Sequence, residues 1–105
     1  MKFLVTGGLG FIGSNMTDFL VEKGHTVIVV DDLSTGDPSY ANPKAIYVNA
    51  HITDLDTMQG LSQNCDAIFH FAAWARLQRS INDPLGTNNA NVNGTLALLE
   101  AARRN

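Results

Sequence analysis

One glycine-rich stretch, Thr6-Gly-Gly-Leu-Gly-Phe-Ile-Gly13, constrains the fold more than any other part of this sequence. A short apolar run, Phe3 to Val5, precedes it and is typical of a buried strand. The apolar residues that follow recur at helical spacing, namely Phe11, Ile12, Met16, Phe19 and Leu20. A strand, a tight glycine turn and a helix in direct succession form a setting in which the turn can bind a pyrophosphate.

Three glycines of this turn have different expected tasks. Gly7 lets the chain leave the strand abruptly, Gly10 keeps a Cβ away from a ligand, and Gly13 lets the helix pack close to the sheet. The N–H groups of Phe11 and Ile12, at the positive end of the helix dipole, are then free to hold the phosphates. Glycine turns are common, so the pattern alone also fits a turn that serves only packing.

The next apolar run strengthens the phosphate-binding interpretation. Residues Thr26 to Val30 form a second expected strand, and Asp31 ends it. Asp31 follows Gly10 by about 20 residues, which is where a carboxylate meets the ribose hydroxyls of a bound dinucleotide. The alternative is a solvated loop acid. We expect NAD rather than NADP, because Asp31 would repel a 2′-phosphate and no arginine follows it.

Four ordered motifs resemble the extended short-chain dehydrogenase/reductase family. Within it they are most similar to the NAD-dependent sugar-nucleotide epimerases and dehydratases of the UDP-glucose 4-epimerase type. The motifs are Thr6–Gly13, Asp31–Gly36, Asp66–Ala73, and Asn91–Thr95 with Leu98–Arg103. The resemblance runs from Lys2 to Asn105 and implies that NAD is the cofactor and that a nucleotide-sugar is a partner of a longer parent protein.

The resemblance also implies which residues contact NAD. Beside the turn residues Gly7, Gly10, Phe11, Ile12 and Gly13, it assigns Asp31, Asp32, Ser34, Thr35, Gly36, His51, Ile52, Phe71, Ala72, Ala73 and Asn91. His51 stands where the family has an Asp that meets the adenine amino group. A histidine presents no carboxylate there, although a neutral ring nitrogen can accept one hydrogen bond. Ile52 is expected to pack on the adenine ring.

The remaining pattern predicts a single α/β domain over residues 1–105, the N-terminal half of a Rossmann-type doubly wound parallel sheet. We expect the order β-α-β-β-α-β-α and the strand order 3-2-1-4. The expected strands are 2–6, 26–31, 45–48 and 67–71, and the expected helices are 11–23, 54–61 with Thr53 as N-cap, and 84 to about 104. Residues 72–83 are expected to form a loop with at most one helical turn. The apolar stripe of the last helix is expected at Val92, Leu96 and Leu99.

Composition narrows the function classes. Charged residues make up only 16% of the chain, which favours a sheet buried on both faces. A net charge of −3 without a basic run gives no reason to expect a nucleic-acid partner. With one cysteine, no apolar segment of membrane length and no signal-peptide pattern at the N-terminus, we expect a cytoplasmic protein without membrane contact.

The chain offers no convincing catalytic residues. The resembling family uses a Tyr-x-x-x-Lys pair on one helix face, and Tyr40-Ala-Asn-Pro-Lys44 matches that spacing only literally, because Pro43 disfavours a helix there. His70 ends the fourth expected strand and is better explained as a satisfied polar group than as an acid-base. We therefore expect NAD binding without turnover by these residues alone.

Two other functions remain open from the sequence. One is a free-standing nucleotide-binding or NAD-sensing module that acts with a partner. The other is a structural domain that associates with itself. Self-association is expected in either case, since the strand at 67–71 lacks a neighbour on one side and Val92, Leu96 or Leu99 would be partly exposed. The expected product is a homodimer.

Overall fold

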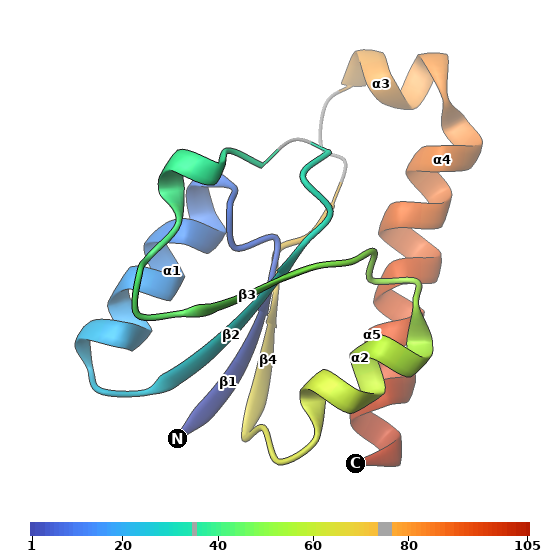
Figure 1. Cartoon of the computed structure of the whole chain (residues 1–105). Coiled ribbons are helices and arrows are strands. Elements are labelled where there is room, and N and C mark those ends of the chain that lie inside the picture. Colours follow the sequence, from blue (N-terminus) through green and yellow to red (C-terminus); the bar gives the residue numbers. More distant parts are fainter. Residues whose placement is uncertain (35, 74–76) are drawn as a thin grey trace.

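The computed structural model describes residues 1–34, 36–73 and 77–105. Their order is the predicted alternation of strands and helices (Figure 1). The elements are β1 (Lys2–Thr6), α1 (Phe11–Glu22), β2 (Thr26–Asp31), the 3₁₀ turn η1 (Pro38–Tyr40), β3 (Ile46–Asn49), α2 (Leu55–Ser62), β4 (Ala67–His70), α3 (Leu77–Asn82), α4 (Pro84–Asn88), the π-helical turn η2 (Asn89–Asn93) and α5 (Gly94–Arg104).

The four strands form one parallel sheet in the order β3-β2-β1-β4, which confirms the prediction. In the register of the sheet, Phe3 of β1 lies opposite Val27 of β2 and Ala67 of β4. Because all four strands run the same way, their carboxyl ends meet at one edge, where the glycine turn begins. In an open α/β sheet this edge is where ligands bind.

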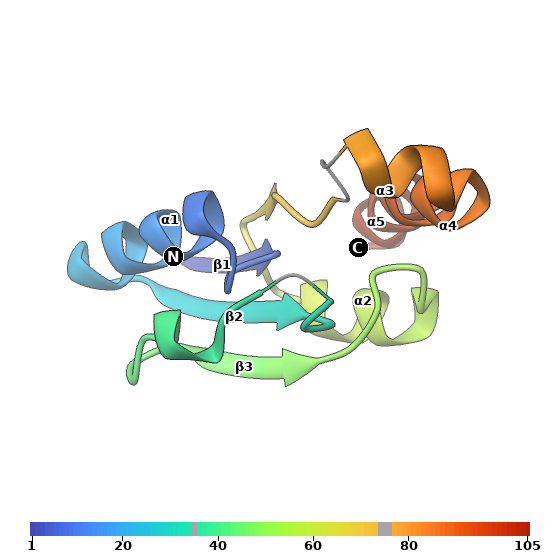
Figure 2. The same ribbon diagram turned by 90° about the horizontal axis from the view of Figure 1, so that it is seen from above.

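Both faces of the sheet are buried, and alternate residues of each strand fill them. Leu4, Ile28 and Val30 face a core that α2 and α5 complete with Met58, Leu98 and Ala101. The opposite core contains Phe3, Val5, Val27, Val29 and, from α1, Leu20. Figures 1 and 2 show α1 on one side of the molecule and α2 with α5 on the other. Burial on both faces explains why the strands are continuous apolar runs.

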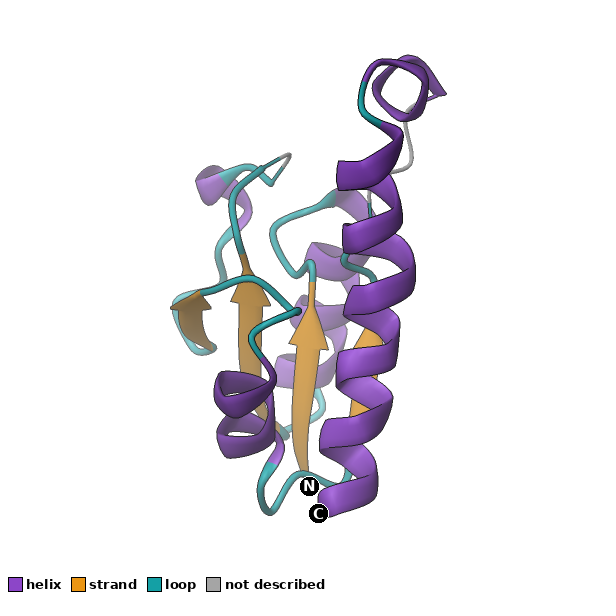
Figure 3. Ribbon diagram, turned by 90° about the vertical axis from the view of Figure 1, so that its right-hand side faces the viewer, coloured by secondary structure: helices purple, strands orange, loops and turns teal. Residues whose placement is uncertain are grey.

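Several element boundaries differ from the sequence prediction. The N-cap of α2 is Asp54, not Thr53, because the Asp54 carboxylate accepts from the backbone N–H of Thr57. Residues 77–82, expected to be mostly loop, form helix α3. The last predicted helix is not α-helical throughout. The segments α4, η2 and α5 follow one another without a break as one helical column, in which η2 is a π turn (Figure 3).

The prediction that Val92, Leu96 and Leu99 form the buried face of that column is wrong. Val92, Leu96 and Leu99 are 57%, 63% and 64% exposed. The buried positions are instead Ala90, Gly94, Leu98 and Ala101. Both sets have helical spacing, and the set with the smaller side chains faces the core because it allows close packing. A Cβ on Gly94 would overlap the Ile52 side chain, so the column approaches the segment that follows β3 closely at that point.

Candidate functional site

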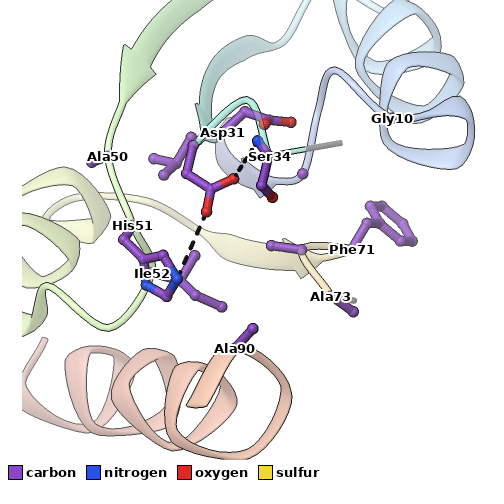
Figure 4. A pocket seen from close by; sticks show the side chains of 13 residues that line it. Gly10, Asp31, Ser34, Ala50, His51, Ile52, Phe71, Ala73 and Ala90 are labelled. Atoms are coloured by element: carbon purple, nitrogen blue, oxygen red, sulfur yellow. Dashed lines mark hydrogen bonds and ion pairs between the residues drawn. The ribbon is translucent and has the colours of Figure 1, made fainter. Parts of the chain in front are cut away.

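A pocket opens at the carboxyl edge of the sheet, between the glycine turn, the ends of β2, β3 and β4, and the π turn η2 (Figure 4). Its lining includes ten of the predicted contact residues, namely Gly7, Gly10, Asp31, Asp32, Ser34, His51, Ile52, Phe71, Ala72 and Ala73. It also includes Val30, Ala50 and Ala90, which the sequence analysis did not single out. In the sequence, Ala50 and Ala90 stand next to the predicted contacts His51 and Asn91. Their small size at those positions was the only sequence feature that could have predicted their place in the pocket.

The fold itself requires most glycines of the turn. Gly7 has a φ of 68°, in the left-handed region that favours glycine, and a Cβ there would lie 2.7 Å from the backbone N of Ala72. A Cβ on Gly8 would overlap Val29, and one on Gly13 would overlap the carbonyl oxygen of Gly7. These glycines are needed for packing, whether or not a ligand binds.

Gly10 is different, because no neighbour among the described residues requires a glycine there. Its φ is −82°, and an added Cβ would meet only the carbonyl oxygen of Gly7, at 3.4 Å. Gly10 lines the pocket at the start of α1, where no side chain caps the helix. Phe11 and Ile12, the first residues of α1, carry exposed side chains. An open backbone surface at an uncapped helix N-terminus fits a bound phosphate.

Asp31 holds the loops around the turn and also borders the pocket. Its carboxylate accepts hydrogen bonds from the N–H of Leu9, at 3.1 Å, and of Leu33, at 2.7 Å. Leu33 has a φ of 65°, which is unusual for a side chain of its size, and the bond to Asp31 stabilises it there. Gly36 packs against the same carboxylate, since a Cβ there would lie 2.9 Å from its oxygens. A carboxylate has about four acceptor positions, so Asp31 keeps capacity for a ribose hydroxyl.

Asp32 and His51 form the polar side of the pocket beyond Asp31. One oxygen of Asp32 accepts from the N–H of Ser34 at 2.9 Å, and the other lies 3.7 Å from Nε2 of His51, as the dashed line at His51 in Figure 4 marks. Nδ1 of His51 accepts from the N–H of Thr53 at 3.2 Å and lies 2.6 Å from the Thr53 hydroxyl. The acceptor nitrogen that the sequence analysis assigned to a base is therefore already in use.

Ile52 and Ala90 continue the lining of the pocket next to His51 (Figure 4). Ile52 is buried and packs against Gly94 of α5, while an edge of it lines the pocket. Ala90 of η2 completes this part of the lining, and its neighbour Asn91 does not belong to the lining. The backbone oxygen of Asn91 accepts from the Thr95 hydroxyl. The asparagines that are poor helix formers thus mark a π turn at the pocket, a feature found often at functional sites.

The end of β4 is tied to β1 and α5 by hydrogen bonds whose direction follows from Thr95. The Thr95 hydroxyl donates its proton to the backbone oxygen of Asn91, so it accepts from Nε2 of His70, at 2.9 Å. Nδ1 of the neutral ring then accepts from the Thr6 hydroxyl, at 2.7 Å. The oxygen of that hydroxyl accepts from the N–H of Ala72, at 3.2 Å, and shares the N–H of Phe71 with the backbone oxygen of Thr6.

Burial lowers the pKa of His70 below its ordinary value, so the neutral ring is favoured. Both ring nitrogens are occupied by hydroxyl groups, which confirms the prediction of a satisfied polar residue. The Thr6 hydroxyl, which His70 orients, holds the backbone of Phe71 and Ala72 beside Gly7. The resemblance places the nicotinamide half of NAD along this segment. Figure 4 shows Phe71 and Ala73 at the end of β4 that faces this turn.

The remaining predicted contact residues are Gly13 and Thr35, and the remaining motif is the Tyr40–Lys44 pair. Gly13 lies beneath the turn and Thr35 lies outside the described residues. Tyr40 ends the 3₁₀ turn η1, and Lys44 lies in a later turn, so the two do not share a helix face. Over the described ranges no helix is long and apolar enough to cross a membrane, and no group of three or more His, Cys, Asp or Glu could hold a metal ion.

Comparisons with known proteins agree with this geometry. The family model described as the NAD dependent epimerase/dehydratase family matches residues 3–105. The UDP-glucose 4-epimerase of Mycolicibacterium smegmatis is 41% identical over 109 residues, which is 98% of this chain and 35% of that protein. The solved UDP-glucose 4-epimerase of Thermotoga maritima with UDP-glucose superposes with a TM-score of 0.96 at 39% identity, over 99% of this chain and 34% of that one.

A second solved structure contains the cofactor. The UDP-glucose 4-epimerase of Thermus thermophilus in complex with NAD superposes with a TM-score of 0.89 at 33% identity, over 99% of this chain and 34% of that one. The chain thus spans about a third of the length of the curated relatives and solved structures it matches. The match of fold, glycine turn and family model over nearly every residue shows that the chain belongs to the NAD-dependent epimerase/dehydratase family.

Proposed function

We propose that this chain binds NAD(H) in the pocket at the carboxyl edge of the sheet. The observation that carries the proposal is Gly10, whose missing side chain has no explanation in packing and a direct one in a bound pyrophosphate. The N-terminus of α1 would hold the phosphates, Asp31 the adenosine ribose, and Phe71 to Ala73 the nicotinamide half. Bound NAD supplies a hydride acceptor, and the residues named here orient it.

NAD is proposed in preference to NADP. Asp31 and Asp32 both border the pocket, so a 2′-phosphate on the ribose would lie among carboxylates. The test is calorimetric titration of the unmutated chain with NAD and with NADP. Tighter binding of NAD is expected, and equal affinities would contradict the proposed preference.

Asp31→Asn is the variant that isolates the charge. Asparagine keeps an oxygen that can accept from Leu9 or Leu33, whereas alanine would leave both N–H groups without a partner and weaken the fold as well. We expect Asp31→Asn to bind NAD more weakly and to narrow its preference over NADP. A preference that survived the change would assign selectivity to another group.

The chain would serve as the cofactor-binding portion of a nucleotide-sugar epimerase or dehydratase. Relatives and solved neighbours named UDP-glucose 4-epimerase support this assignment. We propose that these residues alone do not interconvert UDP-glucose and UDP-galactose, because Tyr40 and Lys44 are not arranged on one helix face. A turnover assay tests this, and turnover that Tyr40→Phe abolished would restore the rejected motif. The cytoplasm is the proposed setting, where the free thiol of Cys65 stays reduced.

We also propose that the chain forms a homodimer. β4 is an edge strand of the sheet, and a groove of about 480 Å³ lies between it and α5. Val92, Leu96 and Leu99 are exposed apolar side chains of the helical column, and Leu99 also lines this groove. An unpaired strand edge and an apolar stripe both favour pairing with a second copy.

A further inference from the structure

The order of the strands determines where a bound dinucleotide places its purine base. The pyrophosphate belongs to the turn after β1, and the ribose belongs to Asp31 at the end of β2. The next strand outward is β3, whose carboxyl end leads into Ala50, His51 and Ile52. The base would therefore lie beside His51, where Ala50, Ile52 and Ala90 supply apolar lining.

His51 faces that position with a hydrogen-bond donor. The backbone N–H of Thr53 can only donate, so Nδ1 of His51, 3.2 Å away, is the acceptor. A neutral imidazole has a single N–H, which must then be at Nε2. A protonated imidazole also carries a proton at Nε2, so this atom donates in either state.

The Nε2–H group is available to a ligand. Its partner among the described residues is Asp32, whose oxygen lies 3.7 Å away, and that separation is too long for a hydrogen bond. The His51 side chain is partly exposed and lines the pocket. Asp32 itself follows Asp31 at the end of β2, on the ribose side, and one of its oxygens already accepts from Ser34.

Resting on the proposed function, we propose that His51 makes the base end of the pocket a donor site that does not select adenine. The 6-amino group of adenine is a donor, so Nε2–H can bond adenine only through a neighbouring ring nitrogen such as N7 and not at position 6. A 6-oxo purine places an acceptor at the same position and can make this bond. With position 6 of the base at Nε2, where the resemblance places it, 6-oxo purine dinucleotides bind at least as well as NAD.

The test compares NAD with nicotinamide hypoxanthine dinucleotide, which differs in presenting an oxo group at position 6. Calorimetric titration of the full chain should give affinities that are equal or up to about tenfold in favour of the hypoxanthine form. His51→Asp replaces the donor with an acceptor. It should shift the ratio of the two affinities by about tenfold or more toward NAD, because a carboxylate accepts from the amino group and repels the oxo group.

Two further variants separate the role of His51 from that of its neighbours. Thr53→Val removes the hydroxyl and leaves the backbone N–H that assigns the ring proton, so the ratio should stay unchanged. Asp32→Asn should also leave the ratio unchanged, and a shift toward the hypoxanthine form would show that Asp32 reads the amino group instead.

The outcomes are distinct for the two proposals. A preference of the unmutated chain for NAD over the hypoxanthine form, or a ratio that His51→Asp leaves unchanged, would overturn the inference and leave NAD binding intact. Failure of both dinucleotides to bind would overturn the proposed function, and the inference with it.

Discussion

At the scale of single residues, the glycine turn separates folding from binding. Gly7, Gly8 and Gly13 have neighbours that a Cβ would meet, and Gly10 has only one ordinary contact. The same residue type therefore serves two purposes within one short turn. The sequence alone cannot show which glycine serves which purpose. That distinction depends on the positions of Val29, Ala72 and the Gly7 oxygen, which only the structure gives.

This difference predicts the behaviour of two alanine variants. Gly10→Ala should change the free energy of unfolding by less than about 1 kcal/mol, the usual difference between glycine and alanine at an N-cap, and weaken NAD binding by about tenfold or more. Gly13→Ala should destabilise the fold by about 1–3 kcal/mol, because its Cβ overlaps backbone. Denaturant melts and calorimetry measure the two effects. Equal loss of stability in both variants would contradict the assignment of Gly10 to a ligand.

At the scale of elements, His70 joins β4 to the helical column. Its ring bridges Thr6 of β1 and Thr95 of α5 through bonds whose direction is fixed. The bridge needs the neutral ring, since a protonated Nδ1 could no longer accept from the Thr6 hydroxyl. Burial lowers the pKa of His70 in the folded chain, whereas the unfolded chain protonates near the ordinary value of 6.5.

The stability of the fold should therefore fall in acid over a defined range. Above about pH 6.5 both states are neutral at His70 and the contribution is complete; below it the unfolded state binds the extra proton, so stability decreases toward the lowered pKa. The slope from this one group is at most about 1.4 kcal/mol per pH unit. Denaturant melts between pH 7.5 and pH 5.5, the chosen assay range, should show a smaller slope for His70→Gln. Identical slopes would rule out this role for His70.

Another titrating group does not interfere with that measurement. Hydrogen bonds from Arg103 and Arg104 lower the pKa of Glu100 to about 2, so its contribution is lost only as the pH falls from 4.5 toward 2. This loss lies below the proposed range.

Sequence patterns predicted the elements better than their faces. The strands and their order followed from apolar runs and from the rules for parallel crossovers. The buried face of α5 did not, because Gly94 and Ala101 carry little hydrophobic signal while exposed Leu96 and Leu99 carry much. The spacing of the glycines predicted that Gly7 and Gly10 line the pocket at the turn. The tautomer of His51 was not, since it depends on the backbone N–H of Thr53.

At the scale of the whole molecule, the exposed stripe and the edge of β4 predict association. Sedimentation equilibrium over a wide concentration range should show a monomer–dimer equilibrium. Leu96→Glu should shift it toward the monomer if the helical column forms the interface, because a charge would be buried there. Phe19→Glu is the matched control, since Phe19 is an exposed apolar side chain on α1, across the sheet. A monomer at every concentration, with β4 amides exchanging freely, would disprove association.

The unequal roles of the four turn glycines have a consequence for mutational tolerance. A library randomised across the turn and screened only for expression and folding should accept small side chains at Gly10 and reject them at Gly7, Gly8 and Gly13. Selection for cofactor retention should reject substitution at all four positions. The difference between the two screens would map the footprint of the ligand onto the sequence, with no bound structure required.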